Sequence, residues 1–241
     1  MAERSEPDPR RIVRAAYDRI ADRYASWVRS APTDTTVEEH LATVGERLPA
    51  GALLLDLGCG SGHRLLQLAD RFTITAVDIS FEQVRHARKL LPHARILQAD
   101  MTRLEFVPTS FDAVTSLYAF NHLPFGELPG LLNRIAGWLR PGGLLVANMG
   151  TTWNPGSFEA DWLGAPTYFS GYDAGTNRAL LEAAGFQLVT ARDETLWETI
   201  GGQTRPARFF WVVAQRPISG RHGPSTSLHA GLDTSHAGLY S

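Results

Sequence analysis

Cysteine, long apolar runs and net charge are all scarce in this sequence, and each scarcity excludes a class of protein. One cysteine, Cys59, is present among 241 residues, which excludes a disulfide framework and a zinc site made of thiolates. No apolar run approaches the roughly 20 residues that a membrane span needs. The net charge is only -2, which gives no electrostatic reason to expect binding to nucleic acid or to an anionic membrane. Residues 1–14 lack the apolar core of a signal peptide, so we expect a cytoplasmic protein.

What is present is enough for one large folded domain. Hydrophobic residues make up 44% of the chain and charged residues 20%, a composition typical of a chain that buries a core. We expect a helical cap over residues 1–50 and a core of alternating strands and helices over residues 51–217. Residues 218–241 are rich in Ser, Gly, His and Thr without periodicity, which predicts a disordered tail.

Two helices are predicted in the cap. Asp8 is placed to cap the first helix, and Pro9 suits the first helical position because its missing N–H needs no partner there. A second helix is predicted over residues 36–48. The first helix carries an apolar and aromatic face at helical spacing, made of Val13, Tyr17, Ile20, Tyr24 and Trp27.

The core alternates strands with helices, which predicts an α/β fold with a largely parallel sheet. After an irregular stretch that follows Gly150, a helix near 173–184 precedes two strands, 186–198 and 206–215. These two should pair antiparallel because no helix separates them. The other strands are predicted at 53–55, 72–77, 95–99, 111–117 and 144–148, and the helices between them near 63–70, 81–91 and 125–139.

One turn is rich in glycine. Gly58, Gly60 and Gly62 directly follow the first strand, and a helix begins after them. Glycine there lets the backbone bend sharply and approach a ligand without a Cβ in the way. Asp78 ends the second strand, 20 residues after Gly58, where a carboxylate accepts hydrogen bonds from two ribose hydroxyls. The combination predicts an adenosine-type ligand.

The spacing of the turn bears on which ligand this is. A dinucleotide site favours G-x-G-x-x-G with the pyrophosphate on the helix N-terminus. Here the turn reads G-x-G-x-G, and Asp56 lies just before it. A buried carboxylate beside a ligand suits a cationic group better than a pyrophosphate. A nicotinamide-dependent reductase is therefore the less favoured alternative.

These segments resemble the motifs of class I S-adenosylmethionine-dependent methyltransferases. Residues 53–62 resemble the first motif of that family, 77–80 the second and 98–101 the third. The segment from Tyr17 to Tyr24 also resembles the opening helix of the small-molecule branch, which includes quinone-biosynthesis methyltransferases. The resemblance runs from about residue 17 to residue 215, and its further matches are 111–114, 121–123 and 139–143.

The resemblance implies a Rossmann-like fold, with a seven-stranded, mostly parallel sheet whose last strand is antiparallel, helices on both faces and an N-terminal helical cap. It implies S-adenosylmethionine as the cofactor and a small, apolar or aromatic acceptor methylated on O, N or C. The alternative is a protein that binds S-adenosylmethionine without catalysis. At the cofactor the resemblance places Tyr17, Asp56, Gly58, Cys59, Gly60, Gly62, Asp78, Ile79, Asp100, Met101 and Leu117.

Two side chains are candidates for catalysis. His122 follows the fourth strand at the edge where open α/β sheets place their chemistry, and a histidine with a pKa near ~6.5 is a natural proton acceptor. His122 is interpreted as either a general base or a packing residue, and Tyr24 is the second candidate base. Cys59 is interpreted as a small residue that the turn needs, not as a nucleophile. No carboxylate cluster has the spacing of a Mg²⁺ site, so we expect no metal.

Aromatic residues are dense in an insertion over residues 150–172, after the fifth strand. The insertion is interpreted as a lid over the acceptor, or as a segment packed on the sheet edge or against a second subunit. We expect the protein to be a monomer or a homodimer. We expect it to bind a small-molecule acceptor and to bind neither nucleic acid nor a membrane. The acceptor is expected to contact Trp27, Phe120, Trp153, Trp162, Tyr168 and Tyr172.

Overall fold

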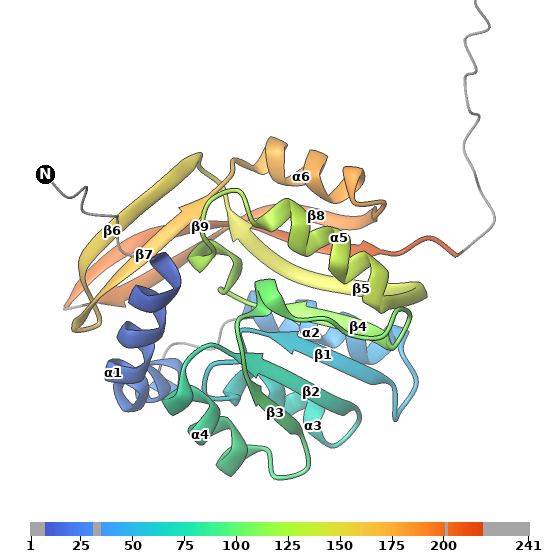
Figure 1. The fold of residues 1–241 in the computed structure, drawn as a ribbon, viewed down its shortest axis with the longest axis horizontal. Helices are drawn as coiled ribbons and strands as arrows, with labels where there is room; N and C mark the ends of the chain where they lie inside the picture. Colours follow the sequence, from blue (N-terminus) through green and yellow to red (C-terminus); the bar gives the residue numbers. More distant parts are fainter. Residues whose placement is uncertain (1–7, 31–34, 201, 219–241) are drawn as a thin grey trace, which may run out of the picture.

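A computed structural model of the protein describes residues 8–30, 35–200 and 202–218. At its centre is a seven-stranded sheet in the order β3-β2-β1-β4-β5-β9-β8 (Figure 1). Strands β1 to β5 are parallel to one another, whereas β9 is antiparallel to both β5 and β8. This is the predicted sheet, with the last strand of the chain antiparallel. The strands are β1 (Leu53–Leu57), β2 (Thr73–Asp78), β3 (Arg95–Gln98), β4 (Phe111–Ser116), β5 (Leu139–Gly150), β8 (Gln187–Ile200) and β9 (Gln203–Gln215).

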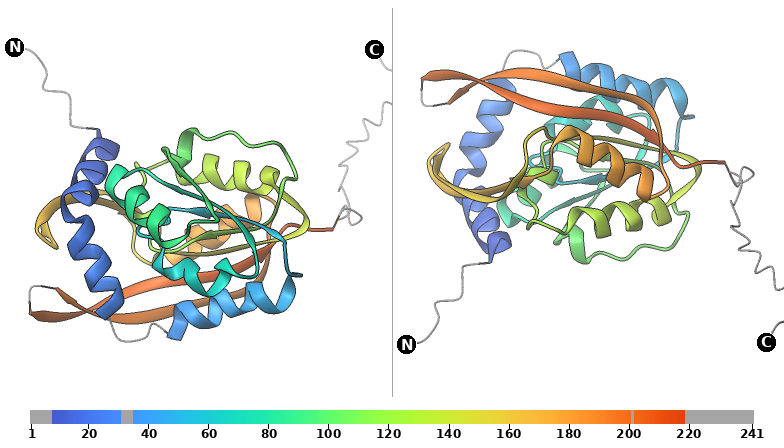
Figure 2. Two further views of the ribbon diagram at one scale, coloured as in Figure 1. Left: turned by 90° about the horizontal axis from the view of Figure 1, so that it is seen from below. Right: turned by 90° about the horizontal axis from the view of Figure 1, so that it is seen from above.

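Helices cover both faces of the sheet because the central strands send apolar side chains to both (Figure 2). In β1, Leu54 packs into one core cluster and its neighbour Leu55 into the other. The first cluster includes residues of α2 (Thr35–Arg47), of α4 (Phe81–Leu90) and of the short α3 (Leu66–Ala69). The second includes residues of α5 (Leu128–Trp138) and α6 (Ala174–Ala183).

Helix α1 (Pro9–Ser30) lies at the carboxyl ends of the parallel strands (Figure 1). Asp8 begins the helix, since its Oδ1 accepts the backbone N–H of Arg10 at 3.1 Å. Ser80 caps α4 by accepting the N–H of Gln83 at 3.1 Å, and its hydroxyl also donates to Asp18 Oδ1 at 2.7 Å. One serine therefore caps a sheet-flanking helix and holds α1 against it.

The insertion is not irregular, as the sequence suggested, but a β-hairpin of β6 (Asn154–Trp162) and β7 (Ala165–Gly171). Its turn is Leu163-Gly164, and both residues have positive φ, 53° and 96°, which matches the twist of a two-residue hairpin loop. A leucine in that conformation is not a turn signal, and prolines at 155 and 166 are unfavourable in strands. For these two reasons the hairpin could not be predicted from the sequence.

Other boundaries differ by a few residues. The helix expected near 63–70 is a 3₁₀ turn (His63–Leu65) followed by α3. Strand β5 begins before the expected Pro141–Gly143 turn, because Leu139 already pairs with Phe111 of β4 and the register shifts after that pair. Residues 219–241, most of the expected tail, lie outside the described residues, and the division into cap, core and tail stays a prediction. No helix in the described ranges has the length and apolar character needed to cross a membrane.

Candidate functional site

The glycine turn after β1 has a backbone that other residues do not readily adopt. Gly58, Gly60 and Gly62 have φ of 82°, 52° and 84°. A Cβ on Gly58 would stand 2.3 Å from Cβ of Ala119, and one on Gly62 would stand 2.9 Å from Leu91. Two of these glycines are therefore needed for close packing as well as for conformation. The result is a tight turn whose backbone faces an open crevice at the sheet edge.

Asp78 is fixed at that crevice by backbone hydrogen bonds. Its Oδ2 accepts the N–H of Gly60 at 2.8 Å and its Oδ1 accepts the N–H of Ser80 at 2.9 Å. Burial raises the pKa of Asp78 to about 6, against the lowering effect of these two hydrogen bonds. Each carboxylate oxygen keeps a further lone pair for a ligand.

Asp56 has a different place. It is buried within β1, 4% exposed, and accepts a hydrogen bond from the hydroxyl of Thr115 on β4. Burial raises its pKa to about 7, opposed by the hydrogen bond from Thr115. It lies beneath the glycine turn and does not line the crevice.

The crevice lining also includes an ion pair that was not predicted from the sequence. Arg10 of α1 donates from Nε to Asp100 Oδ2 at 2.7 Å and from Nη2 to Glu127. Asp100 Oδ1 accepts from the backbone and hydroxyl of Thr102 at 2.9 and 2.8 Å. The crevice is also lined by the apolar residues Ile79, Met101 and Leu117. In the sequence, Arg10 is marked only by its position in the first turn of the predicted first helix.

The crevice fits the adenosine-type ligand expected from the sequence. It is lined by two carboxylates, Asp78 and Asp100, and by apolar side chains. Gly60 forms part of its wall, and a Cβ there would meet Tyr24 at 3.3 Å. A flat apolar ring that carries polar groups matches this lining.

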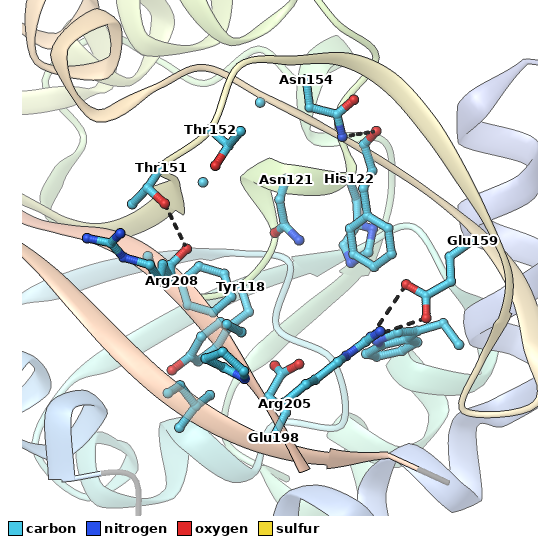
Figure 3. A pocket seen from close by; sticks show the side chains of 18 of the residues that line it. Tyr118, Asn121, His122, Thr151, Thr152, Asn154, Glu159, Glu198, Arg205 and Arg208 are labelled. Carbon is cyan, nitrogen blue, oxygen red and sulfur yellow. Dashed lines mark hydrogen bonds and ion pairs between the residues drawn. The ribbon is translucent and has the colours of Figure 1, made fainter. Parts of the chain in front are cut away.

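A larger cavity of about 710 Å³ adjoins the crevice (Figure 3). It lies among α1, the 3₁₀ turn η3 (Phe120–His122), the end of β5, the hairpin β6–β7 and the extended pair β8–β9. Four residues line both spaces, so they form the boundary between them: Tyr17, Tyr24, Tyr118 and His122.

His122 and Tyr17 form a hydrogen-bonded pair at this boundary. Nδ1 of His122 lies 2.9 Å from the carbonyl oxygen of Tyr168, which only accepts, so Nδ1 carries the proton. Nε2 is then the acceptor for the Tyr17 hydroxyl at 2.9 Å. Burial lowers the pKa of His122 to about 4 and raises the pKa of Tyr17 well above its usual value. Both groups are therefore neutral at pH 7.

Aromatic rings form one wall of the larger cavity. Trp162 of β6 packs against Tyr17, Tyr24 and Trp27, with ring centroids 5.5, 6.0 and 6.3 Å apart. Phe169 packs on His122 at 4.8 Å. The Tyr24 hydroxyl accepts a hydrogen bond from Arg64 at 3.2 Å. Four predicted residues (Tyr17, Tyr24, Trp27 and Trp162) thus meet in one place although they come from α1 and the hairpin.

The opposite wall is charged, which the sequence analysis did not anticipate. Its charged residues come mainly from β8 and β9, two long strands whose charges read as ordinary exposed faces. Arg205 donates to Glu159 of β6 at 3.2 Å (Figure 3). The cavity therefore has a charged part beside the predicted aromatic residues, and its charged residues are Arg64, Glu159, Asp193, Glu198, Arg205 and Arg208.

Some predicted acceptor residues do not reach either cavity. Phe120 is 3% exposed and packs in the core with α5. Trp153 is 54% exposed and stacks with Tyr172 on Phe125. Tyr168 contributes its backbone carbonyl to His122, while its ring packs on Phe158. Trp153, Tyr168 and Tyr172 lie in the same aromatic insertion as Trp162, so position in the sequence alone could not separate them from Trp162.

Besides Asp56, two more predicted cofactor residues, Cys59 and Gly62, lie outside the crevice lining. Cys59 is buried in the core, where burial raises the pKa of its thiol well above the usual value, so it is a packing residue and not a nucleophile. Gly62 packs against α4. Among the residues that the structure describes, no group of three or more His, Cys, Asp or Glu is arranged for a metal, and metal independence stays a prediction.

Comparison with known proteins agrees with the resemblance. Residues 54–143 match the family described as a methyltransferase domain. Over 125 residues, 51% of this chain, the sequence is 34% identical to a dTDP-3-amino-3,4,6-trideoxy-alpha-D-glucopyranose N,N-dimethyltransferase of Streptomyces venezuelae, of which 52% is covered. It is also 34% identical over 114 residues, 45% of this chain, to the 2-methyl-6-phytyl-1,4-hydroquinone methyltransferase of Synechocystis sp., of which 34% is covered. The chain thus spans about half or less of these relatives.

A solved structure shares the fold over nearly the whole chain. The 1,6-didemethyltoxoflavin-N1-methyltransferase of Burkholderia thailandensis, solved with S-adenosylhomocysteine, superposes with a TM-score of 0.64 at 19% identity over 90% of this chain and 93% of that one. The comparisons confirm the predicted Rossmann-like fold, and the matched relatives are methyltransferases, one of them solved with S-adenosylhomocysteine. Residues 54–143 thus match the methyltransferase domain family, and the resemblance of this chain to class I S-adenosylmethionine-dependent methyltransferases is confirmed.

Proposed function

We propose that the protein is an S-adenosylmethionine-dependent methyltransferase that acts on a small molecule bound in the 710 Å³ cavity. The observation that carries the proposal is the meeting of the two spaces at Tyr17, Tyr24, Tyr118 and His122. A donor in the crevice and an acceptor in the cavity would be separated only by these side chains. Holding two reactants in such a geometry supplies much of the rate enhancement of a transfer reaction.

Within the crevice, Asp78 would bind the ribose hydroxyls and Asp100 the adenine amino group. Ile79, Met101 and Leu117 would pack on the adenine, and the backbone of Gly58 and Gly60 would line the methionine end. When bound, S-adenosylmethionine supplies a methyl group on a sulfonium, which is already an activated leaving group. The protein therefore has to position the two reactants, exclude water from them and, where needed, remove a proton from the acceptor.

The Tyr17–His122 pair is suited to that last task. The Tyr17 oxygen can receive a proton from the acceptor while its own proton moves to Nε2 of His122. A base with a pKa of about 4 suffices where methylation makes the acceptor strongly acidic. Tyr24, the other candidate, hydrogen-bonds to Arg64 and lines the same boundary.

Titration with S-adenosylhomocysteine tests the cofactor site. Asp78→Ala should weaken binding about ten- to a hundredfold, because it removes a charge-assisted hydrogen-bond acceptor. Glu182→Gln, on the exposed side of α6 and outside both cavities, should bind as the parent does. Release of S-adenosylhomocysteine from S-adenosylmethionine with a panel of small acceptors then tests transfer. A parent protein that binds neither compound at millimolar concentration contradicts the proposal.

A further inference from the structure

The acceptor cavity has two chemically different walls, and their combination points to the acceptor. One wall presents the rings of Tyr24, Trp27 and Trp162, and the other presents charged side chains of β8 and β9. Figure 3 shows Glu198 at the cavity, with Arg205 beside it and Asn121 and His122 across from it. A ligand can pair only with those charges that are not already paired with another side chain of the protein.

Two of the cavity's cations are engaged with the protein. Arg205 forms an ion pair with Glu159 at 3.2 Å. The guanidinium of Arg64 lies 4.7 Å from the ring centroid of Tyr118 and donates to the Tyr24 hydroxyl at 3.2 Å. Arg208 lies on the exposed part of β9. The positive charges are thus largely committed or at the rim.

Glu198 differs from these groups. Its carboxylate makes no hydrogen bond or ion pair with any residue of the described ranges, although the side chain is partly buried. Burial raises its pKa, and the charges of Arg205 and Arg64, which lower it from a distance, have smaller effects. A partly desolvated carboxylate without a bonded partner is stabilised by a cation.

The aromatic wall is held close to this carboxylate. Nε1 of Trp27 donates to the backbone carbonyl of Thr199 at 3.3 Å, which ties α1 to β8 at the residue next to Glu198. The charge of Glu198 also contributes to the raised pKa of Tyr17, which places it within electrostatic reach of the boundary with the cofactor crevice. Aromatic side chains and a carboxylate therefore line the same cavity.

We infer that the acceptor carries a basic amine, held as an ammonium group between the carboxylate of Glu198 and the ring faces of Trp27 and Tyr24. The inference rests on the proposed function, since it takes the cavity to be the acceptor site. A cation is attracted both by the carboxylate and by the faces of aromatic rings. A neutral or anionic ligand of the same size gains neither contact.

Three indole compounds of similar size test the inference: tryptamine, indole-3-ethanol and indole-3-propionate, which carry a cation, a hydroxyl and an anion. Dissociation constants are measured by ligand-observed NMR, with and without saturating S-adenosylhomocysteine. Tryptamine should bind about tenfold or more tightly than the other two. Glu198→Gln should remove that preference.

Glu194→Gln is the matched control, because Glu194 lies on the same strand but does not line the cavity. It should keep the preference for tryptamine. Equal binding of the three compounds, a preference for the anion, no binding of tryptamine at 10 millimolar (on the order of weak fragment affinity), or an amine preference unchanged in Glu198→Gln each overturn the inference. Failure to bind S-adenosylhomocysteine would instead contradict the proposed function, while the amine preference measured without it would stand.

Discussion

At the scale of single residues, Asp78 has two roles, one in the glycine turn and one in the crevice. Its carboxylate accepts the N–H groups of Gly60 and Ser80, which fixes the glycine turn, and it still faces the crevice. Its raised pKa of about 6 means that the charge needed to accept ribose hydroxyls is lost only slightly below neutral pH. The site should therefore be sensitive to mild acid.

We expect the affinity for S-adenosylhomocysteine to fall about tenfold between pH 7.5 and pH 5. The sign follows from the raised pKa: above about 6 Asp78 is a carboxylate that accepts hydrogen bonds, and below it one oxygen is protonated. Calorimetry across this range measures the effect. Asp78→Asn should bind weakly at every pH with little pH dependence, and an equally steep profile in that variant would assign the titration to another group.

The Tyr17–His122 pair gives a second residue-scale prediction. Because the pKa of His122 lies near 4, kcat/KM should be flat from pH 6 to pH 9 with respect to this group and should fall only in more acidic solution. His122→Ala and Tyr17→Phe should each lower kcat, by about a hundredfold or more if the pair removes a proton.

The double variant should be little worse than either single one, since two residues that act as a unit are not additive. His93→Ala, on an exposed turn away from both boundary residues, is the control for loss of a histidine. Full turnover in His122→Ala would make His122 a packing residue, the other interpretation of the sequence.

At the scale of elements, the hairpin β6–β7 determines which aromatic residues reach the acceptor. Trp162 ends β6 and turns inward onto α1, whereas Trp153 stands before the first strand and stacks on the outside. Contacts between α1 and β7 hold the hairpin over the cavity. This supports the lid interpretation for the part of the insertion near Trp162.

Trp162→Phe should therefore raise the KM of an acceptor severalfold with a smaller change in the affinity for S-adenosylhomocysteine, because the smaller ring leaves the wall incomplete. Trp153→Ala, 54% exposed and outside both cavities, should leave KM unchanged. Steady-state kinetics with any acceptor found, together with thermal unfolding to verify the fold, makes the comparison. A larger effect from Trp153 than from Trp162 would contradict this placement.

At the scale of the whole molecule, the crevice exists only when distant parts of the chain have assembled. The ends of four strands and helix α1 all contribute to its lining. A ligand that binds there binds the folded state and not the unfolded chain. Binding must therefore stabilise the protein against unfolding.

At a concentration of about 100 times its dissociation constant, S-adenosylhomocysteine should stabilise the fold by about 2.7 kcal/mol and raise Tm by about 5–10 °C. Differential scanning fluorimetry measures this shift. Asp78→Ala at the same ligand concentration should show a much smaller one. An equal shift in that variant would indicate binding elsewhere in the molecule.

Much of the site followed from local patterns. The alternation of strands and helices, the glycines of the first turn, and Asp78 and Asp100 at strand exits all depend on residues close together in the chain. Local spacing decides such features, because helix periodicity, turn conformation and the carboxyl edge of a parallel sheet are properties of short segments. The sequence by itself therefore determined the fold class and the predicted cofactor crevice.

The tertiary structure alone decided how the acceptor cavity is built. Tyr17 meets His122 across 105 positions, Trp27 meets β8, and Arg205 meets Glu159. None of these contacts has a spacing to read, since each depends on how α1, the hairpin and the β8–β9 pair pack around one space. Rings and charges that read as ordinary helix or strand faces became the two walls of a cavity because long-range packing brought them together.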